Sequence, residues 1–414
     1  MATTTLAPAT RPRSVGRTSA PRPPALGGVT PHWFTPVMGT GIVAVALLGL
    51  PVAVPGREPV ALAVWLLAAT LLVGAVVATV GHHVRHPSVA RSHLDHGVVA
   101  HGYGAPPMAL MTVGAGALLV GDRVLGAGPA VVVGVVLWTL GTGLGLLSAV
   151  VVPWRALTRH GLGVADASGA WLMSVVPPVV SAATGALLVP LAPAGAPRVA
   201  LLLLCYALLV AVLPAVVVVL ALLGLRLRRY GVGPTAAVPA LWIVLGPLGQ
   251  SVTAVHHLGG LAPDVLPAAW AAPLTMLVVA YGVPVALLGL GWLVFVLVTT
   301  VRAARTHLPF GLPWWAFTFP VGTIVTAVSG LATTPALVDL GVGGVLRGLA
   351  AVLFAGLVGA WVVVLTRTAR GVVSGELLAP PAPFPAPRAA PGRAPTAGGR
   401  QAGSRAPRTA PRAS

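Results

Sequence analysis

The stretch Trp314–Gly330, WWAFTFPVGTIVTAVSG, indicates the fold of this chain. It is apolar enough to lie in a bilayer, yet it carries Pro320 in mid-segment and a row of small hydroxyl residues. Proline within a helix removes one backbone hydrogen bond and frees a carbonyl one turn back. In hydrocarbon, such a group is tolerated only where protein or a water-filled space satisfies it. We therefore expect a kinked membrane helix that faces a polar space.

The composition of the whole chain is typical of a polytopic all-α membrane protein. Of its 414 residues, 57% are hydrophobic and 8% are charged, whereas a soluble domain carries about 25% charged residues. A spanning helix needs about 20 apolar residues. Ten segments meet this requirement, and all seven acidic residues fall outside them. The segments lie at about 33–50, 60–81, 104–121, 129–152, 171–190, 199–224, 238–258, 269–299, 314–333 and 343–366.

The arginines predict the orientation of these spans. With ten spans and both termini in the cytoplasm, the inside loops and termini carry 21 arginines and the outside loops carry four. We expect residues 31–370 to form the membrane domain, flanked by disordered cytoplasmic segments at 1–30 and 371–414. No signal peptide is predicted. The arginines of the tail suit anionic lipid headgroups, and without a folded basic surface we expect no nucleic-acid binding.

The odd-numbered spans repeat one pattern. In four of them a threonine follows a proline by six residues: Pro106 and Thr112, Pro178 and Thr184, Pro247 and Thr253, Pro320 and Thr326. The first span is a looser copy with Pro36 and Thr40, and the even spans lack the pattern. We interpret this as five helical hairpins in a pseudo-five-fold ring, with five kinked helices around a central pore and five smooth helices facing lipid. For any single span, the same residues could simply tune helix packing.

The predicted pore is neutral. The residues expected to line it are Thr40, Thr112, Ser181, Thr184, Gln250, Thr253, Thr323 and Thr326, and the expected kinks are Pro36, Pro106, Pro178, Pro247 and Pro320. This lining offers hydroxyl groups and one amide but no carboxylate, the usual intramembrane group for cations and proton relay. The pattern therefore favours a small anion, which the excess of arginine would draw to the cytoplasmic mouth. We predict no catalytic residue, metal or cofactor in this pore.

At these residues the chain resembles the tellurite-resistance/dicarboxylate transporter family. That family includes malic-acid transporters, sulfite efflux proteins and slow-type anion channels, and the malic-acid/sulfite branch is the most similar. The matching motifs are HWFTPVMGTGIVA (32–44), YGAPPMALMTVGAG (103–116), WLMSVVPPVVSAATGA (171–186), LWIVLGPLGQSVTA (241–254) and PWWAFTFPVGTIVTA (313–327).

The resemblance implies ten helices in five hairpins, a pore through each subunit of a homotrimer, and a location in the cell membrane. It also implies a phenylalanine that plugs the pore just before the proline of the ninth span, here Phe319. A bulky apolar ring among small polar residues would also occlude a pore by itself. We expect malate, sulfite or another small oxyanion as the substrate.

Histidines gather between the second and third spans, at His82, His83, His86, His93, His96 and His101. Their spacing could place two metal ligands on one helix face, or the loop could sense pH or simply lie at the interface. A membrane-embedded metal-dependent enzyme and a non-transporting sensor therefore stand as alternatives to transport. His256 and His257, at the outer end of the seventh span, are either pore-mouth or interface residues.

Overall fold

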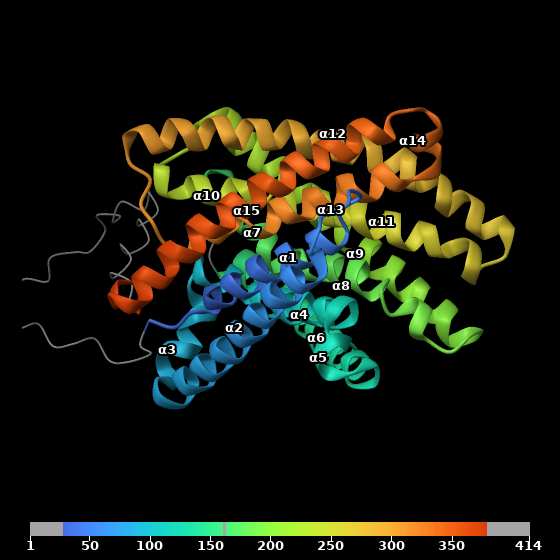
Figure 1. The fold of residues 1–414 in the computed structure, drawn as a ribbon. Coiled ribbons are helices and arrows are strands. Elements are labelled where there is room, and N and C mark those ends of the chain that lie inside the picture. Colours follow the sequence, from blue (N-terminus) through green and yellow to red (C-terminus); the bar gives the residue numbers. More distant parts are fainter. Residues whose placement is uncertain (1–27, 160–162, 379–414) are drawn as a thin grey trace, which may run out of the picture. The chain divides into compact units, whose positions relative to one another are not determined.

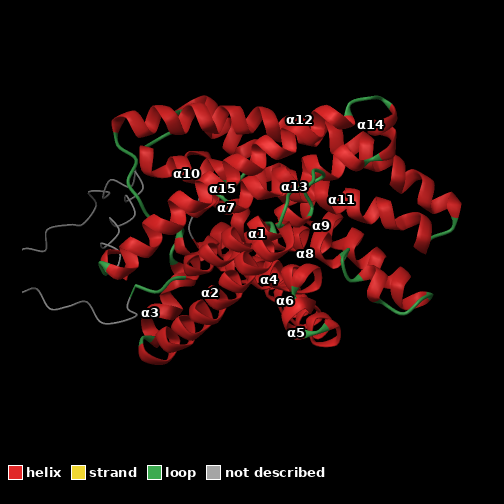
Figure 2. Ribbon diagram, viewed as in Figure 1, coloured by secondary structure: helices red, strands yellow, loops and turns green. Residues whose placement is uncertain are grey.

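A computed structural model of the protein describes residues 28–159 and 163–378. All regular structure in these two ranges is helical, without a strand (Figure 2). Most of the two predicted terminal segments, including the arginine-rich tail, lies outside the described residues. The last long helix continues to Val373, beyond the predicted end of the tenth span near residue 366.

Five long helices, called the outer helices here, each run without a break for 29 to 39 residues. They are α2 (Arg57–Arg85), α6 (Ala127–Arg159), α9 (Ala196–Tyr230), α12 (Ala268–Thr306) and α15 (Gly343–Val373). At most 33% of the most apolar window of each is buried, and aliphatic side chains such as Val77, Leu147 and Leu287 are exposed. An apolar exposed surface of this kind suits contact with lipid.

Five inner helices alternate with the outer helices along the chain, and each follows a short helical segment, called its lead segment here. The pairs are η1 (Pro31–Phe34) with α1 (Thr35–Leu48), η3 (Val99–Gly104) with α4 (Ala105–Val120), α7 (Ala170–Val175) with α8 (Pro177–Gly185), α10 (Val238–Trp242) with α11 (Leu245–Val265), and η7 (Leu312–Phe317) with α13 (Phe319–Thr333). In the four pairs long enough to span, at least 72% of the apolar window is buried.

The five predicted kink prolines lie in the first turn of an inner helix. Pro36, Pro106, Pro178 and Pro320 are each the second residue of their helix, and Pro247 is the third residue of α11. Backbone N–H groups in a first turn have no intrahelical partner, so proline is tolerated there without loss of a hydrogen bond. The sequence predicted a bend within a continuous helix, whereas in the structure a short lead segment ends and a separate α-helix begins one or two residues before the proline.

Among the described residues, nine helical stretches are long and apolar enough to cross a membrane. The remaining predicted span, at about 171–190, is divided between α7, α8 and η5 (Val189–Leu191). None of these three pieces reaches spanning length by itself, because α8 already ends at Gly185.

Contacts between the helices follow one rule around the molecule. Successive inner helices touch, and the last touches the first: α1 with α4, α4 with α8, α8 with α11, α11 with α13, and α13 with α1. Each outer helix contacts the inner helix before it in the chain and the inner helix that follows, with α15 returning to α1. In Figure 1, the labels of α1, α4, α8 and α13 lie in the middle, with α12 above and α2 and α6 below.

Glycine allows the tightest of these contacts. A Cβ added at Gly249 of α11 would overlap the backbone of Thr323 in α13, and one added at Gly39 of α1 would overlap the Thr318 hydroxyl and the Trp315 ring. Backbone atoms cannot move aside as the end of a flexible side chain can. The absent side chain at Gly249 therefore sets the distance between α11 and α13.

Two ion pairs show which connections share an end of the helix assembly. Arg123, in α5 (Asp122–Leu125), lies 2.5 Å from Glu58 at the start of α2. Arg155, near the end of α6, lies 3.0 Å from Asp95 in the connection after α2. Successive connections thus alternate between the two ends, as consecutive spans require. The exposed carboxylates make these pairs weak contributors to stability.

Candidate functional site

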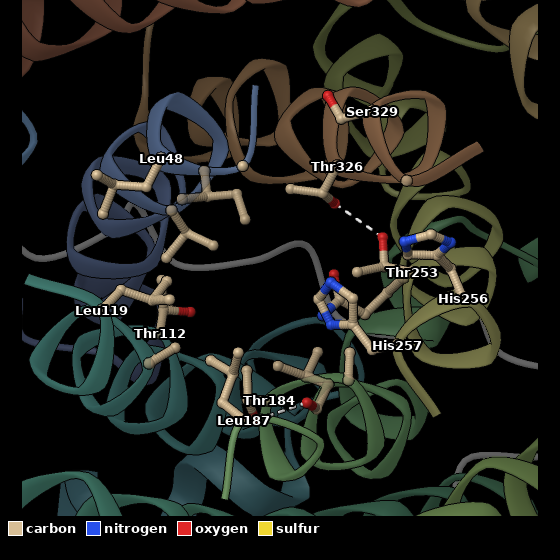
Figure 3. A pocket seen from close by; sticks show the side chains of 18 of the residues that line it. Leu48, Thr112, Leu119, Thr184, Leu187, Thr253, His256, His257, Thr326 and Ser329 are labelled. Atoms are coloured by element: carbon tan, nitrogen blue, oxygen red, sulfur yellow. Dashed lines mark hydrogen bonds between the residues drawn. The ribbon is translucent and has the colours of Figure 1, made fainter. Parts of the chain in front are cut away.

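A cavity of about 210 Å³, called cavity A here, lies among the five inner helices (Figure 3). Aliphatic residues such as Leu48, Leu119 and Leu187 form much of its wall. The polar part of the wall consists of Thr112, Thr184, Gln250, Thr253, His256, His257, Thr326, Ser329 and Thr333. Every inner helix or the turn that follows it contributes to this lining, so cavity A lies where the inner helices converge.

Five of the eight predicted pore-lining residues border cavity A: Thr112, Thr184, Gln250, Thr253 and Thr326. The four threonines that follow a proline by six residues are among them. Figure 3 shows their side chains projecting from four different helices toward one shared space. The Pro-to-Thr spacing therefore corresponds to one face of each inner helix, two turns after its start.

The other three predicted lining residues are buried in contacts between helices. The Thr40 hydroxyl accepts a hydrogen bond of 3.1 Å from the Trp361 indole of α15. Ser181 accepts one of 3.0 Å from Thr142 of α6. Thr323 lies 3.1 Å from the Leu245 carbonyl oxygen of α11. These three hydroxyl groups hold the helices together and border neither cavity described here.

The threonine hydroxyls of cavity A have hydrogen-bond acceptors within the protein, namely carbonyls of their own helices and, for Thr253 and Thr326, each other. Each hydroxyl has one proton to donate. The bonds run from Thr112 to the Met108 carbonyl at 2.7 Å, from Thr184 to that of Val180 at 2.8 Å, from Thr253 to that of Gly249 at 3.1 Å, and from Thr326 to that of Thr323 at 3.0 Å. Thr253 and Thr326 also lie 2.8 Å apart (Figure 3). Each of these protons is therefore committed within the protein, and the cavity meets oxygen lone pairs.

Three other polar side chains at cavity A have buried atoms without a hydrogen-bond partner in the described chain. These atoms are Oε1 of Gln250, Nδ1 of His257 and Oγ of Ser329. His256 differs, because its Nδ1 lies 3.3 Å from the Thr334 hydroxyl. Buried polar groups are normally paired, so unpaired ones that border a cavity are suited to a polar ligand.

A second cavity of about 270 Å³, called cavity B here, lies among the lead segments and the first turns of the inner helices. His32, Met38, Met108, Met173 and Leu312 are among its lining residues. Sequence reasoning did not identify this cavity. A signal was nevertheless present, because Met38 and Met108 each follow the repeat proline by two residues.

Phe319 is the one described residue that borders both cavities. It is the first residue of α13, and only 2% of it is exposed. Cavity A is bordered by the later turns of the inner helices, and cavity B by their beginnings. The ring therefore lies between two spaces at opposite ends of the inner helices.

The lead segment before Phe319 is held by the last outer helix. The Trp315 indole donates a 3.0 Å hydrogen bond to the Thr368 hydroxyl of α15. One residue earlier on each side, the Arg367 guanidinium lies 4.8 Å from the centre of the Trp314 ring, a cation–π distance. These contacts fix η7, and with it the start of α13.

The histidines between α2 and α4 pack on one another. The rings of His82 and His93 are stacked, with centres 5.2 Å apart and planes at 3°. Within the described ranges, no group of three or more His, Cys, Asp or Glu side chains could hold a metal ion. Burial, followed by the nearby His82, His83 and His96, lowers the pKa of His93 to about 4. His93 is thus neutral at physiological pH.

Comparison with known proteins agrees with a membrane transport role. A family model described as SLAC1, voltage-dependent anion channel, matches residues 28–369. The sulfite efflux pump SSU1 of Trichophyton rubrum is 28% identical over 311 residues, which cover 74% of this chain and 82% of that protein. An uncharacterized transporter of Methanocaldococcus jannaschii is 25% identical over 299 residues, covering 72% and 82% respectively.

The family model covers far more than half of the chain. The proteins it describes, and the sulfite efflux pumps, are transporters or channels and not enzymes, which removes the alternative of a membrane-embedded enzyme. The chain belongs to the SLAC1 family of voltage-dependent anion channels, and is a multi-pass membrane protein that transports anions.

Proposed function

We propose that the protein moves a small oxyanion, in the first place sulfite, across the cell membrane through a pore among the inner helices that Phe319 closes. The observation that carries this proposal is the position of Phe319 between cavity A and cavity B. Without its ring, the two cavities would join into one passage along the inner helices.

The lining of this path suits an anion better than a cation. No Asp, Glu, Lys or Arg side chain is among the described residues that border either cavity. A path without carboxylates offers a metal cation or a proton no charged binding site. A neutral path that contains amide and imidazole groups can replace part of the hydration of an anion.

Sulfite is the first choice of substrate because relatives that cover most of the chain are named sulfite efflux pumps. The volume of cavity A, about 210 Å³, is well above the minimum of about 10–15 Å³ that one water molecule needs, so it can admit a small oxyanion. Malate, which the sequence resemblance also implies, is the alternative substrate that the assay below compares.

The proposed architecture is ten spans in five hairpins, with the inner helices in a pseudo-five-fold ring. The recurring contacts between inner and outer helices support the ring, and α7 together with α8 would form the fifth span. The arginine distribution supports cytoplasmic termini, with extramembrane segments at 1–30 and 371–414. The proposed homotrimer, with one pore in each subunit, rests on the family resemblance.

A flux assay in liposomes tests the proposal. Purified full-length protein is reconstituted, and the release of sulfite, malate, chloride and nitrate is measured with and without a pH gradient. We expect release of sulfite above that from protein-free liposomes, and faster release from the Phe319→Ala variant. Transport of malate but not sulfite would overturn the choice of substrate, and the absence of any anion flux would overturn the function.

A further inference from the structure

We propose that one face of α11, formed by Gln250 and His257, is the anion-binding site of cavity A. This inference rests on the proposed function in one respect, namely that cavity A is part of the transport path. It adds that the five inner helices contribute unequally. Two of the three unpaired polar groups at the cavity lie on this one helix, although the sequence repeat makes the inner helices resemble one another.

The helical spacing places these residues on one side of α11. Gln250, Thr253 and His257 follow one another by three and four residues, which aligns them along one face of a helix. All three border cavity A. In Figure 3, His257 projects toward the middle of the cavity.

The threonine side chains contributed by the other helices cannot act as donors in this conformation. Thr112 of α4 and Thr184 of α8 each donate their single proton to a carbonyl of their own helix, at 2.7 and 2.8 Å. Thr326 of α13 has its single proton taken by the Thr323 carbonyl at 3.0 Å or by the Thr253 hydroxyl at 2.8 Å. Each hydroxyl therefore presents an oxygen lone pair to the cavity, which repels an anion.

Gln250 and His257 carry two of the three uncommitted polar groups at cavity A, and the third, Oγ of Ser329, lies on α13. Gln250 is 5% exposed, its Oε1 is buried without a partner, and its amide makes no hydrogen bond to another described residue. Since oxygen and nitrogen of an amide exchange places by rotation, this side chain can turn its two N–H donors toward a ligand. Nδ1 of His257 is likewise buried without a partner, two turns further along α11.

These two groups define the chemistry of the ligand. An anion with two or more acceptor oxygens can receive N–H bonds from Gln250 at one oxygen and meet His257 at another. A proton on Nδ1 donates to such an oxygen, whereas a bare Nδ1 accepts the proton of a hydrogen-bearing oxyanion such as hydrogen sulfite. In both cases one proton lies between the ring and the ligand. An oxyanion offers several acceptor oxygens to these two groups, whereas a halide offers a single atom.

The test uses purified full-length protein with sulfite as the probe and two separate measurements. Calorimetry measures binding in detergent, and release from liposomes measures flux. We expect Gln250→Leu and His257→Leu each to weaken sulfite binding at least tenfold, which corresponds to about 1.4 kcal/mol. Gln250→Glu keeps the size of the side chain but adds a negative charge, so it should abolish binding. His307→Leu, at an exposed histidine after α12, is the matched control and should bind as the unmodified protein does.

Thr184→Val separates this site from a symmetrical ring of hydroxyls, since it removes a hydroxyl that another inner helix, α8, contributes to the same cavity. Its effect should be at least fivefold smaller than that of Gln250→Leu. Equal effects of the two changes, or unaltered binding in all the α11 variants when size-exclusion chromatography shows intact protein, would overturn the inference. Absence of sulfite binding to the unmodified protein would do so as well. Binding without flux would instead refute the transport function and leave the site standing.

Discussion

Replacing Phe319 with alanine tests the proposed gate most directly. The ring is 98% buried between the two cavities, since only 2% of the residue is exposed. Opening the path requires the ring to leave this position. Exposing a fully buried phenylalanine side chain costs about 1.5–3 kcal/mol. At about 1.4 kcal/mol for each factor of ten, the closed form is favoured about tenfold to a hundredfold, and alanine should raise the flux by about that factor.

The assay compares initial rates of sulfite release from liposomes that contain equal amounts of inserted protein. Phe317→Ala is a matched control, because Phe317 is 8% exposed, lies two residues away and borders neither cavity. Its ring packs against Trp242 and Trp314, with ring centres 5.0 and 5.4 Å away. Both variants should lose stability, by about 3 kcal/mol for a buried phenylalanine. Only Phe319→Ala should gain flux.

Two outcomes would refute this reasoning. If Phe319→Ala inserts normally and its flux is unchanged, the ring does not limit passage. If Phe317→Ala raises the flux equally, the gain comes from loosening of the region around η7 and not from removal of a gate.

Two further predictions concern stability. Gly249→Ala should lower the stability of the helical domain by about 1–3 kcal/mol, because the new methyl group overlaps the Thr323 backbone. Gly246→Ala is the control, since a methyl group there meets open space and should be neutral or stabilising. Thermal unfolding in detergent compares the two variants, and equal effects would contradict the tight contact. Folding lowers the pKa of His93 from 6.5 to about 4, so the folded protein holds this ring in its neutral form. Above about pH 6.5 the ring is also neutral in the unfolded chain, and His93 causes no loss of stability. As the pH falls from 6.5 toward 4, the unfolded chain takes up a proton that the folded protein does not, and the stability decreases by at most about 1.4 kcal/mol per pH unit. His93→Gln should therefore show a smaller decrease in melting temperature over this range, and an identical decrease would exclude His93 as the cause.

The sequence predicted the helical segments well because apolar length determines them. Each of the ten predicted segments has helical counterparts in the structure, and the threonines that follow a proline by six residues meet at cavity A. Proline was harder to interpret. It either bends a helix or begins one, and the choice depends on whether the preceding residues find partners outside the helix, which no local pattern records.

Residues three positions after the repeat proline show a second limit of the sequence. Gln250 borders cavity A, whereas Ser181 and Thr323, at the same repeat position, bond to neighbouring helices. At 3.6 residues per turn this position lies about 60° from that of the cavity threonines, near the boundary between two faces. A small rotation of each helix then decides which way the side chain points. The direction of a hydroxyl proton is not encoded in the residue type either.

The difference between whole outer helices and interrupted inner helices has a consequence for biogenesis. Every outer helix has a higher mean hydropathy than every inner span that is long enough to cross a bilayer. A long, uninterrupted apolar segment leaves the translocon for lipid by itself, whereas a segment broken near its start exposes backbone groups that lipid cannot satisfy. The inner segments therefore depend on protein neighbours already in the bilayer. We therefore expect insertion of this protein to be cooperative, so that a truncated chain that lacks one outer helix leaves its inner partner without a stable place in the membrane.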